Sequence, residues 1–148
     1  MKILGKKGSF QLIKIRHLRI VEAALLLPLA FFAVRLVRLE RWRGTLRAPD
    51  NSSQPSSADF RTVKELGQAV ERAAQLVPGE YVCLPKAMVC HWMAKRRRIS
   101  TGVVFGIAAP PSDGSARALH AWIEHNGTPV LDAAGNNGYP IQLRSFSN

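Results

Sequence analysis

The sequence predicts one α+β domain in which helices come first and a small antiparallel sheet comes last, with a helical arm in front. Helical periodicity dominates up to residue 97, whereas the later segments are short, rich in β-forming residues and separated by turn residues. The 148 residues suffice for one domain with a modest core and an appendage. With 47% hydrophobic and 21% charged residues, the composition excludes global disorder.

The net charge of +11 is concentrated near the N-terminus. Residues 1–47 hold 11 basic and 2 acidic side chains, whereas residues 48–148 hold 10 basic and 8 acidic ones. The basic character therefore concerns partners of the arm, such as nucleic acid, anionic lipid or an acidic peptide, more than the chemistry of the domain.

Residues 1–47 form the predicted arm, which is basic, apolar and helical. Its uncharged core, residues 23–34, would span about 18 Å against about 30 Å of hydrocarbon, which disfavours a transmembrane helix. The long charged leader and the arginines that follow the core disfavour a secretory signal. Pro28 either starts a second helix or bends a single one. An apolar stripe follows at helical spacing: Leu29, Phe32, Leu36 and Leu39.

Two uses of this stripe are open. The helix either packs on its own domain or docks on a membrane surface or a partner protein. The second use would make the protein peripheral to the membrane.

The folded domain is expected to occupy residues 59–148, after a linker of Pro, Ser and Asn over residues 48–58. Thr62 and Glu65 have the spacing of a capping box, which predicts a helix start, and Pro78-Gly79 predicts its end. The apolar positions of this helix are Val63, Leu66, Val70, Ala73 and Leu76.

A second helix is predicted over residues 81–97. Pro85 fits its first turn, where no amide proton is needed, and the basic residues 95–98 fit its last turn, where they meet the negative end of the helix dipole. We interpret the basic run as a solvated helix end. A nucleic-acid patch would need more basic residues with aromatic residues between them, so no nucleic acid partner is expected.

Short strands are predicted after this helix. Residues 101–109 form a buried strand, residues 118–124 and 128–133 form a hairpin around Asn126-Gly127, and residues 141–143 form one more short strand.

The two cysteines, Cys83 and Cys90, are not expected to form a disulfide, because seven residues along a helix separate them by about 10 Å. Two unpaired thiols fit a reducing compartment, so we expect a cytoplasmic location. The four scattered histidines complete no zinc-ligand spacing, so neither a metal nor another cofactor is expected.

Cys83 stands at the start of the second predicted helix. There the dipole and the free amides favour a thiolate and can help to hold an oxyanion. The alternative is a small buried side chain, and position by itself does not decide between the two. Cys90 lies inside the helix, so we expect it in the core.

His120 and Asp132 lie on the two arms of the predicted hairpin. A two-residue loop, Asn126-Gly127, would put Asp132 opposite Ala121, on the wrong face for His120. A three-residue loop from His125 to Gly127 would put Asp132 directly opposite His120, with about 5 Å between the Cβ atoms. A thiol, an imidazole and a carboxylate then form a cysteine-nucleophile triad, so the triad predicts the three-residue loop.

Other titratable residues fit the site less well. His91 would lie about 12 Å along the helix from Cys83, too far for a general base. Glu124 and His125 are predicted to be exposed at the hairpin tip.

At these residues the chain resembles a known family. The motifs are CLPKA at a helix start, a basic helix end, VVFGIA, ALHAWIE and an aspartate twelve residues after the histidine. Together they are similar to the transglutaminase-like cysteine peptidases of lasso-peptide biosynthesis, and more narrowly to the stand-alone leader-peptidase half of the split maturation protein. The resemblance covers residues 62–140 and extends more loosely to the apolar N-terminal helix.

The resemblance implies a papain-like core, in which the nucleophile helix packs on a small antiparallel sheet. It implies Cys83 as nucleophile, His120 as general base and acid, and Asp132 as the orienting carboxylate. The implied reaction is removal of the leader from a ribosomally made precursor peptide. The implied partners are that precursor, a separate leader-recognition protein and an ATP-dependent lasso cyclase. Because the chain lacks room for the winged recognition domain of fused members, leader capture is expected in trans.

Two other functions use the same residues differently. Acyl transfer to an amine, as in transglutaminases, needs the same triad, because the outcome depends on whether water or an amine reaches the thioester. A non-catalytic basic protein would instead bind nucleic acid or a membrane surface.

Overall fold

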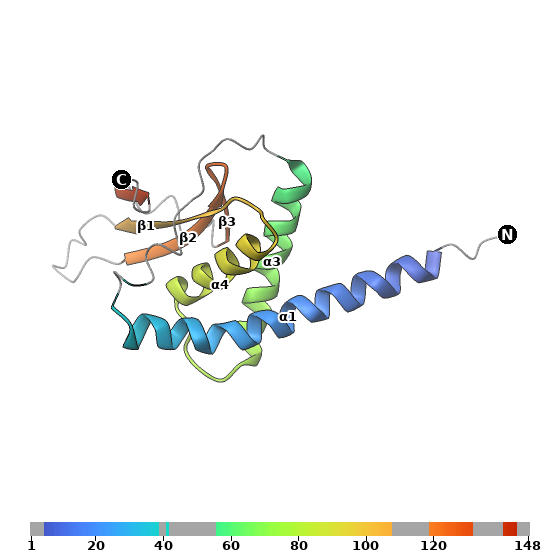
Figure 1. Cartoon of the computed structure of the whole chain (residues 1–148), viewed down its shortest axis with the longest axis horizontal. Helices are drawn as coiled ribbons and strands as arrows, with labels where there is room; N and C mark the ends of the chain where they lie inside the picture. The colour runs from blue at the N-terminus through green and yellow to red at the C-terminus, as the bar shows by residue number, and fades with distance from the viewer. Residues whose placement is uncertain (1–4, 39–40, 42–55, 108–118, 132–140, 145–148) are drawn as a thin grey trace, which may run out of the picture.

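The computed structural model describes residues 5–38, 41, 56–107, 119–131 and 141–144 (Figure 1). Within these ranges the α+β order is as predicted, with the helices before the strands. The helices are α1 (Gly5–Leu36), α3 (Ser57–Leu76) and α4 (Cys83–Arg96). The strands are β1 (Gly102–Ile107), β2 (Leu119–His125), β3 (Thr128–Leu131) and β4 (Ile141–Arg144), so the short C-terminal strand is confirmed.

The four strands form one antiparallel sheet in the order β3-β2-β1-β4. Alternate side chains of the two central strands enter the core, because successive residues of a strand point to opposite faces. Val103 of β1 pairs with Ile123 of β2, and both are fully buried. This face of the sheet lies against α3 and α4.

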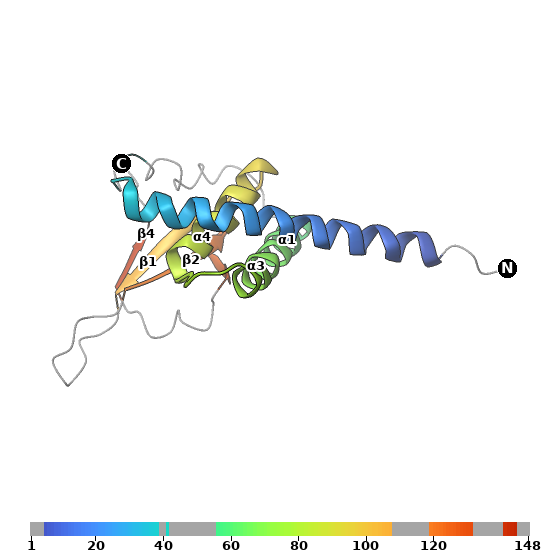
Figure 2. The same ribbon diagram turned by 90° about the horizontal axis from the view of Figure 1, so that it is seen from below.

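Helix α4 is the centre of the molecule, in contact with α1, α3, β1 and β2 (Figures 1 and 2). The consecutive residues Ala87, Met88, Val89 and Cys90 point in successive directions around it, and all four are fully buried. A helix that is apolar all round has to be enclosed, and α4 is enclosed by two helices and a sheet.

Helix α1 is one continuous helix that contains Pro28, and its N-terminal half projects beyond the other elements (Figures 1 and 2). It packs on α3 and α4 through Ala23, Leu27 and Ala30, whose small or flexible side chains permit close approach. The predicted stripe was wrong as the packing face, because its described members are all more than half exposed: Leu29, Phe32 and Leu36. Leu39 lies outside the described residues.

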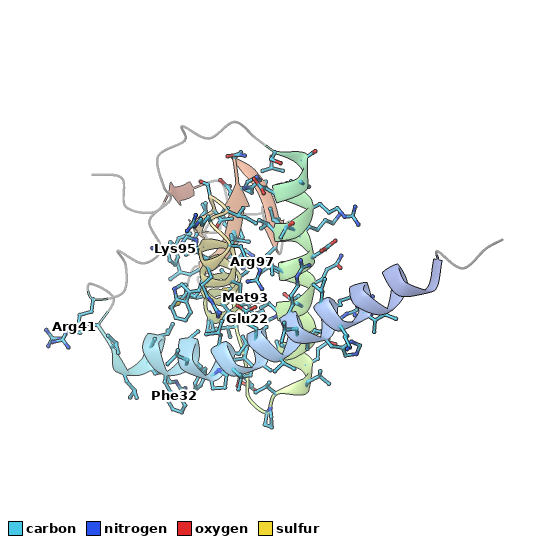
Figure 3. The ribbon with its side chains drawn as sticks, turned by 45° about the vertical axis from the view of Figure 1, so that its right-hand side comes forward. Glu22, Phe32, Arg41, Met93, Lys95 and Arg97 are labelled. Atoms are coloured by element: carbon cyan, nitrogen blue, oxygen red, sulfur yellow. The ribbon has the colours of Figure 1, made fainter. Side chains whose placement is uncertain are left out.

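Ion pairs hold α1 on the two other helices. Arg19 pairs with Glu65 of α3, and this hydrogen bond lowers the pKa of Glu65. Glu22 accepts hydrogen bonds from Arg97 at 2.6 and 3.3 Å, and its other partner is Arg96 at 2.9 Å. Figure 3 shows the Glu22 and Arg97 side chains turned toward one another. The basic end of α4 is therefore more than the predicted solvated helix end, since it fastens α1.

Helix α3 begins at Ser57, inside the predicted linker and five residues before the predicted capping box. Thr62 is an interior residue whose hydroxyl donates to the carbonyl of Ala58 at 2.9 Å, and the Glu65 carboxylate accepts from Arg61 at 3.2 Å. The capping-box prediction was wrong because the helix begins five residues earlier. Thr62 and Glu65 therefore lie inside the helix, where they bond to Ala58 and Arg61. Of the predicted apolar positions, Leu76 is exposed, whereas the others are buried.

The hairpin between β2 and β3 turns through two residues, so the predicted three-residue loop was wrong. Asn126 (φ 50°) and Gly127 (φ 77°) both lie in the left-handed region, as a type I′ turn requires. The extra residue of the hairpin is a bulge further along. Glu124 pairs with Pro129 but Ile123 pairs with Leu131, which leaves one β3 residue without a position opposite. Proline has no amide proton for the ladder, which explains why the irregularity falls beside it on this edge strand.

Candidate active site

Cys83 is the first residue of α4, as predicted. The preceding residue, Val82, is extended (φ −72°, ψ 179°) and ends the loop from α3. Pro85 is accommodated in the first turn because its missing amide proton would have no helical acceptor there. The Cys83 side chain is half-buried at the edge of the core. Its thiol therefore lies where unpaired helical amides and the positive end of the helix dipole are available.

Cys90 lies two turns further along the same helix and is fully buried, which confirms the prediction that it belongs to the core. Burial raises the pKa of its thiol to about 12. Because the thiolate is the nucleophile, Cys90 is inert at neutral pH.

His120 is the second residue of β2 and is half-buried. Its ring stacks on that of Trp122, with 5.9 Å between the ring centroids and an interplanar angle of 27°. The residue opposite on β1 is Gly106, which has no side chain to fill the space beside the imidazole. Ala121 and Ile123 point into the core, so His120 and Trp122 belong to the other face of β2.

Helix α4 and strand β2 run in the same direction, and both begin on the same side of the molecule (Figures 1 and 2). The fold thus brings the start of the cysteine helix and the start of the histidine strand to one end of the domain. Cys83 packs at the edge of the core, whereas His120 belongs to the other face of β2. A catalytic pair therefore has to meet at the end of the sheet, where β2 begins.

Two buried polar residues, Glu124 and His125, follow His120 on β2 and belong to opposite faces of the strand, and sequence reasoning missed both. Trp122 donates its indole N–H to Glu124 at 3.0 Å, and the Nδ1 atom of His125 lies 2.6 Å from the carbonyl oxygen of Ser100. Glu124 and His125 are 8% and 4% exposed, so the prediction that both are exposed was wrong.

Glu124 is buried because the buried indole N–H of Trp122 needs an acceptor. The carboxylate two residues along the strand shares its face and supplies that acceptor. The period-two pattern of His120, Trp122 and Glu124 is the sequence signal that could have revealed the contact between Trp122 and Glu124.

His91 is also accounted for by local structure. It is buried, and its Nδ1 atom lies 2.9 Å from the hydroxyl oxygen of Thr101, just before β1. This contact ties the middle of α4 to the residue before β1, two turns along the helix from Cys83.

The proposed carboxylate, Asp132, lies outside the described residues. The last described pair of the hairpin is Ile123 with Leu131, directly before it.

Two hollows in the surface lie away from this end of the domain. One, of about 310 Å³, lies between α1 and α3 and contains Arg16, Arg19 and Arg72. The other, of about 270 Å³, lies between α3 and the edge strand β3. Neither lining includes Cys83 or His120.

A helix that begins with a cysteine and packs on an antiparallel sheet with a histidine on a central strand defines a class of protein, the transglutaminase-like α+β domain. The family model of the transglutaminase-like superfamily matches residues 23–142. The chain belongs to this superfamily, which includes cysteine peptidases and acyl transferases. Searches of curated proteins and of solved structures gave no match.

Proposed function

We propose that this protein is a cysteine peptidase that removes the leader from a ribosomally made lasso precursor peptide. The observation that carries the proposal is the contrast between the two thiols. Cys83 begins α4 and is half-buried, whereas Cys90 is enclosed and stays protonated. Membership of the transglutaminase-like superfamily and the motifs around Cys83 and His120 support the same reading.

In this proposal His120 takes the proton of the Cys83 thiol, and the resulting thiolate attacks the carbonyl carbon of the bond that joins leader and core peptide. The first-turn amides of α4 stabilise the oxyanion. His120 donates a proton to the departing amine of the core peptide, which leaves the leader as an acyl-thioester on Cys83. His120 then takes a proton from water as the water oxygen attacks the thioester carbonyl. The C–S bond breaks, the leader leaves as the free acid, and His120 returns the proton to the Cys83 sulfur.

Asp132 is the proposed orienting carboxylate, and the hairpin register supports it in a new way. The two-residue turn would have put Asp132 on the wrong face if the pairing had continued unbroken. The bulge before Leu131 shifts the register by one residue. This shift removes the register that would have put Asp132 on the wrong face for His120.

The partners and the location belong to the same proposal. The substrate is the precursor, a separate recognition protein presents its leader, and an ATP-dependent cyclase takes the freed core peptide. The unpaired thiols favour the cytoplasm as the place of action.

The test is mass spectrometry of the cognate precursor after incubation with this protein and its recognition partner. Wild-type protein should release leader and core as two hydrolysed fragments. Cys83→Ala should leave the precursor intact, and Cys90→Ala, which changes a thiol in the same helix, should still cleave. Iodoacetamide should label the folded wild-type protein once, at Cys83, and abolish cleavage.

Two outcomes would contradict the proposal. Intact precursor with the wild-type protein would exclude leader removal. A leader joined to an added amine, in place of the free acid, would instead assign acyl transfer to the same residues.

A further inference from the structure

Helix α1 carries a second apolar face on the side away from the domain. Six side chains on this face recur every three or four residues, and each is more than half exposed. We call them the outer stripe: Leu18, Val21, Leu25, Leu29, Phe32 and Leu36. Figure 3 shows Phe32 pointing away from α4 on the outer side of α1.

The outer stripe is long and continuous. From Leu18 to Leu36 it covers about 27 Å along the helix axis. Its six positions are aliphatic or aromatic, so the surface offers dispersion contacts and burial to a partner. A patch of this kind on a water-soluble surface marks an interaction site.

Positive charge lies at both ends of the outer stripe. Lys14 precedes Leu18 by one turn on the same face, and at the other end Arg35 lies beside Leu36 while Arg38 and Arg41 follow it; all four are exposed. The acidic residue between Leu18 and Leu36, Glu22, is turned toward Arg97 and is not offered to the outside (Figure 3). An apolar stripe with basic ends is complementary to acyl chains beneath anionic headgroups.

The contacts on the inner face of α1 determine whether the helix could cross a bilayer or lie along its surface. Residues Ile13–Leu36 are long and apolar enough to cross a membrane, and 17% of the 18-residue apolar window within them is buried. Crossing would either break the ion pairs from Arg19 to Glu65 and from Glu22 to Arg97 or, with these pairs kept, take charged α3 and α4 into hydrocarbon. With these contacts kept, α1 can lie only along the membrane surface.

We propose that the outer stripe binds the surface of an anionic lipid membrane, with α1 lying in the plane of the interface and the domain on its aqueous side. Bound in this way, the leucines enter the boundary between headgroups and acyl chains while the basic ends meet lipid phosphates. The proposal does not depend on catalysis, so Cys83→Ala should bind equally well.

The test is flotation of the full-length protein with vesicles of phosphatidylglycerol and phosphatidylcholine in equal parts. Wild-type protein should float with these vesicles. The double variant Leu25→Glu/Leu29→Glu should bind about a hundredfold more weakly, since each lost leucine contact weakens partition about tenfold. Circular dichroism and urea unfolding should show that this variant folds like the wild type.

A matched control lies elsewhere on the surface. Leu119 at the start of β2 is 72% exposed, almost the same as Leu25 at 74%, but it is not part of α1. Leu119→Glu should float as the wild type does. Equal loss in Leu119→Glu would show a nonspecific effect of added negative charge and would overturn the assignment to α1.

A comparison of neutral with anionic vesicles tests whether the basic residues contribute to binding. Vesicles of phosphatidylcholine alone should bind the wild type at least about tenfold more weakly, and added salt should weaken binding to the anionic vesicles. Bound protein should be released by alkaline carbonate, as a peripheral protein is.

Three other results would sink the proposal. Absence of wild-type protein from the anionic vesicles would exclude the membrane. Resistance to carbonate would mean that α1 spans the bilayer. A dimer in light scattering that Leu25→Glu/Leu29→Glu converts to a monomer, with no flotation, would assign the outer stripe to a second copy of this chain.

Discussion

Cys83 and Cys90 have the same side chain on the same helix and differ in their surroundings. Cys83 is half-buried in the first turn, where amide protons are unpaired, and Cys90 is enclosed by the apolar core. The helix start was predictable from Pro85 and from the turn residues before it. The burial of Cys90 was predictable from its interior position. The burial of Glu124 and His125 was not, because it depends on what the indole of Trp122 and the carbonyl of Ser100 require.

The thiol of Cys90 should make stability fall in alkaline solution. Its pKa is raised from 9.0 to about 12 by burial, so the unfolded chain loses this proton first as pH rises. The contribution of the buried Cys90 thiol to the free energy of unfolding is fully present below pH 9.0 and is lost as pH rises toward about 12. Urea unfolding across this window should show a decline in the wild type that is steeper by about 1.4 kcal/mol per pH unit than in Cys90→Ala. Parallel declines in the two proteins would contradict this expectation.

At the scale of elements, the ends of helices and turns were harder to predict than the elements themselves. Helix α4 ends in a Schellman motif: Ile99 donates to Ala94 at 3.1 Å and Arg98 donates to Lys95 at 3.0 Å. This geometry puts Arg98 in the left-handed region (φ 59°), where glycine is usual. The arginine run hides the motif in the sequence. The hairpin is a second example, because its bulge lies beside Pro129 and not in the turn, where it was predicted.

Arg98→Gly should stabilise the protein by about 0.5–1 kcal/mol, because glycine adopts positive φ without a steric penalty. Arg98 is exposed, so few contacts are lost. Lys95→Gly is the matched control, since Lys95 is also exposed but helical, and it should destabilise by about 1 kcal/mol. Thermal and urea unfolding measure both. A loss of stability in Arg98→Gly would show that its side chain holds the helix end.

At the scale of the whole molecule, α1 is joined to the domain by packing and by charge. Ala23, Leu27 and Ala30 enter the common core, and Glu22 binds Arg97 across to α4. The family match begins at residue 23, within this contact. The apolar residues of α1 lie on both its faces, so the sequence predicted a helix without deciding which face packs.

The Glu22–Arg97 pair should contribute measurably to stability, because Glu22 is 15% exposed and receives two hydrogen bonds. Glu22→Ala and Arg97→Ala should each lower the free energy of unfolding by about 1–3 kcal/mol, and the double variant by less than their sum. Arg61→Ala, which removes an exposed pair with Glu65, should change it by less than about 0.5 kcal/mol. Full additivity in the double variant would argue against a direct interaction.

By itself the sequence determined the α+β order, the helix that begins at Cys83, the buried position of Cys90 and the strand that carries His120. These follow from periodicity, from proline and glycine positions and from local chemistry, which act over a few residues. Tertiary structure decided which face of α1 packs, where the hairpin places its bulge, and why Glu124 and His125 are buried. Each of these depends on a partner distant along the chain, since burial and hydrogen-bond satisfaction are set by the elements that close around a residue.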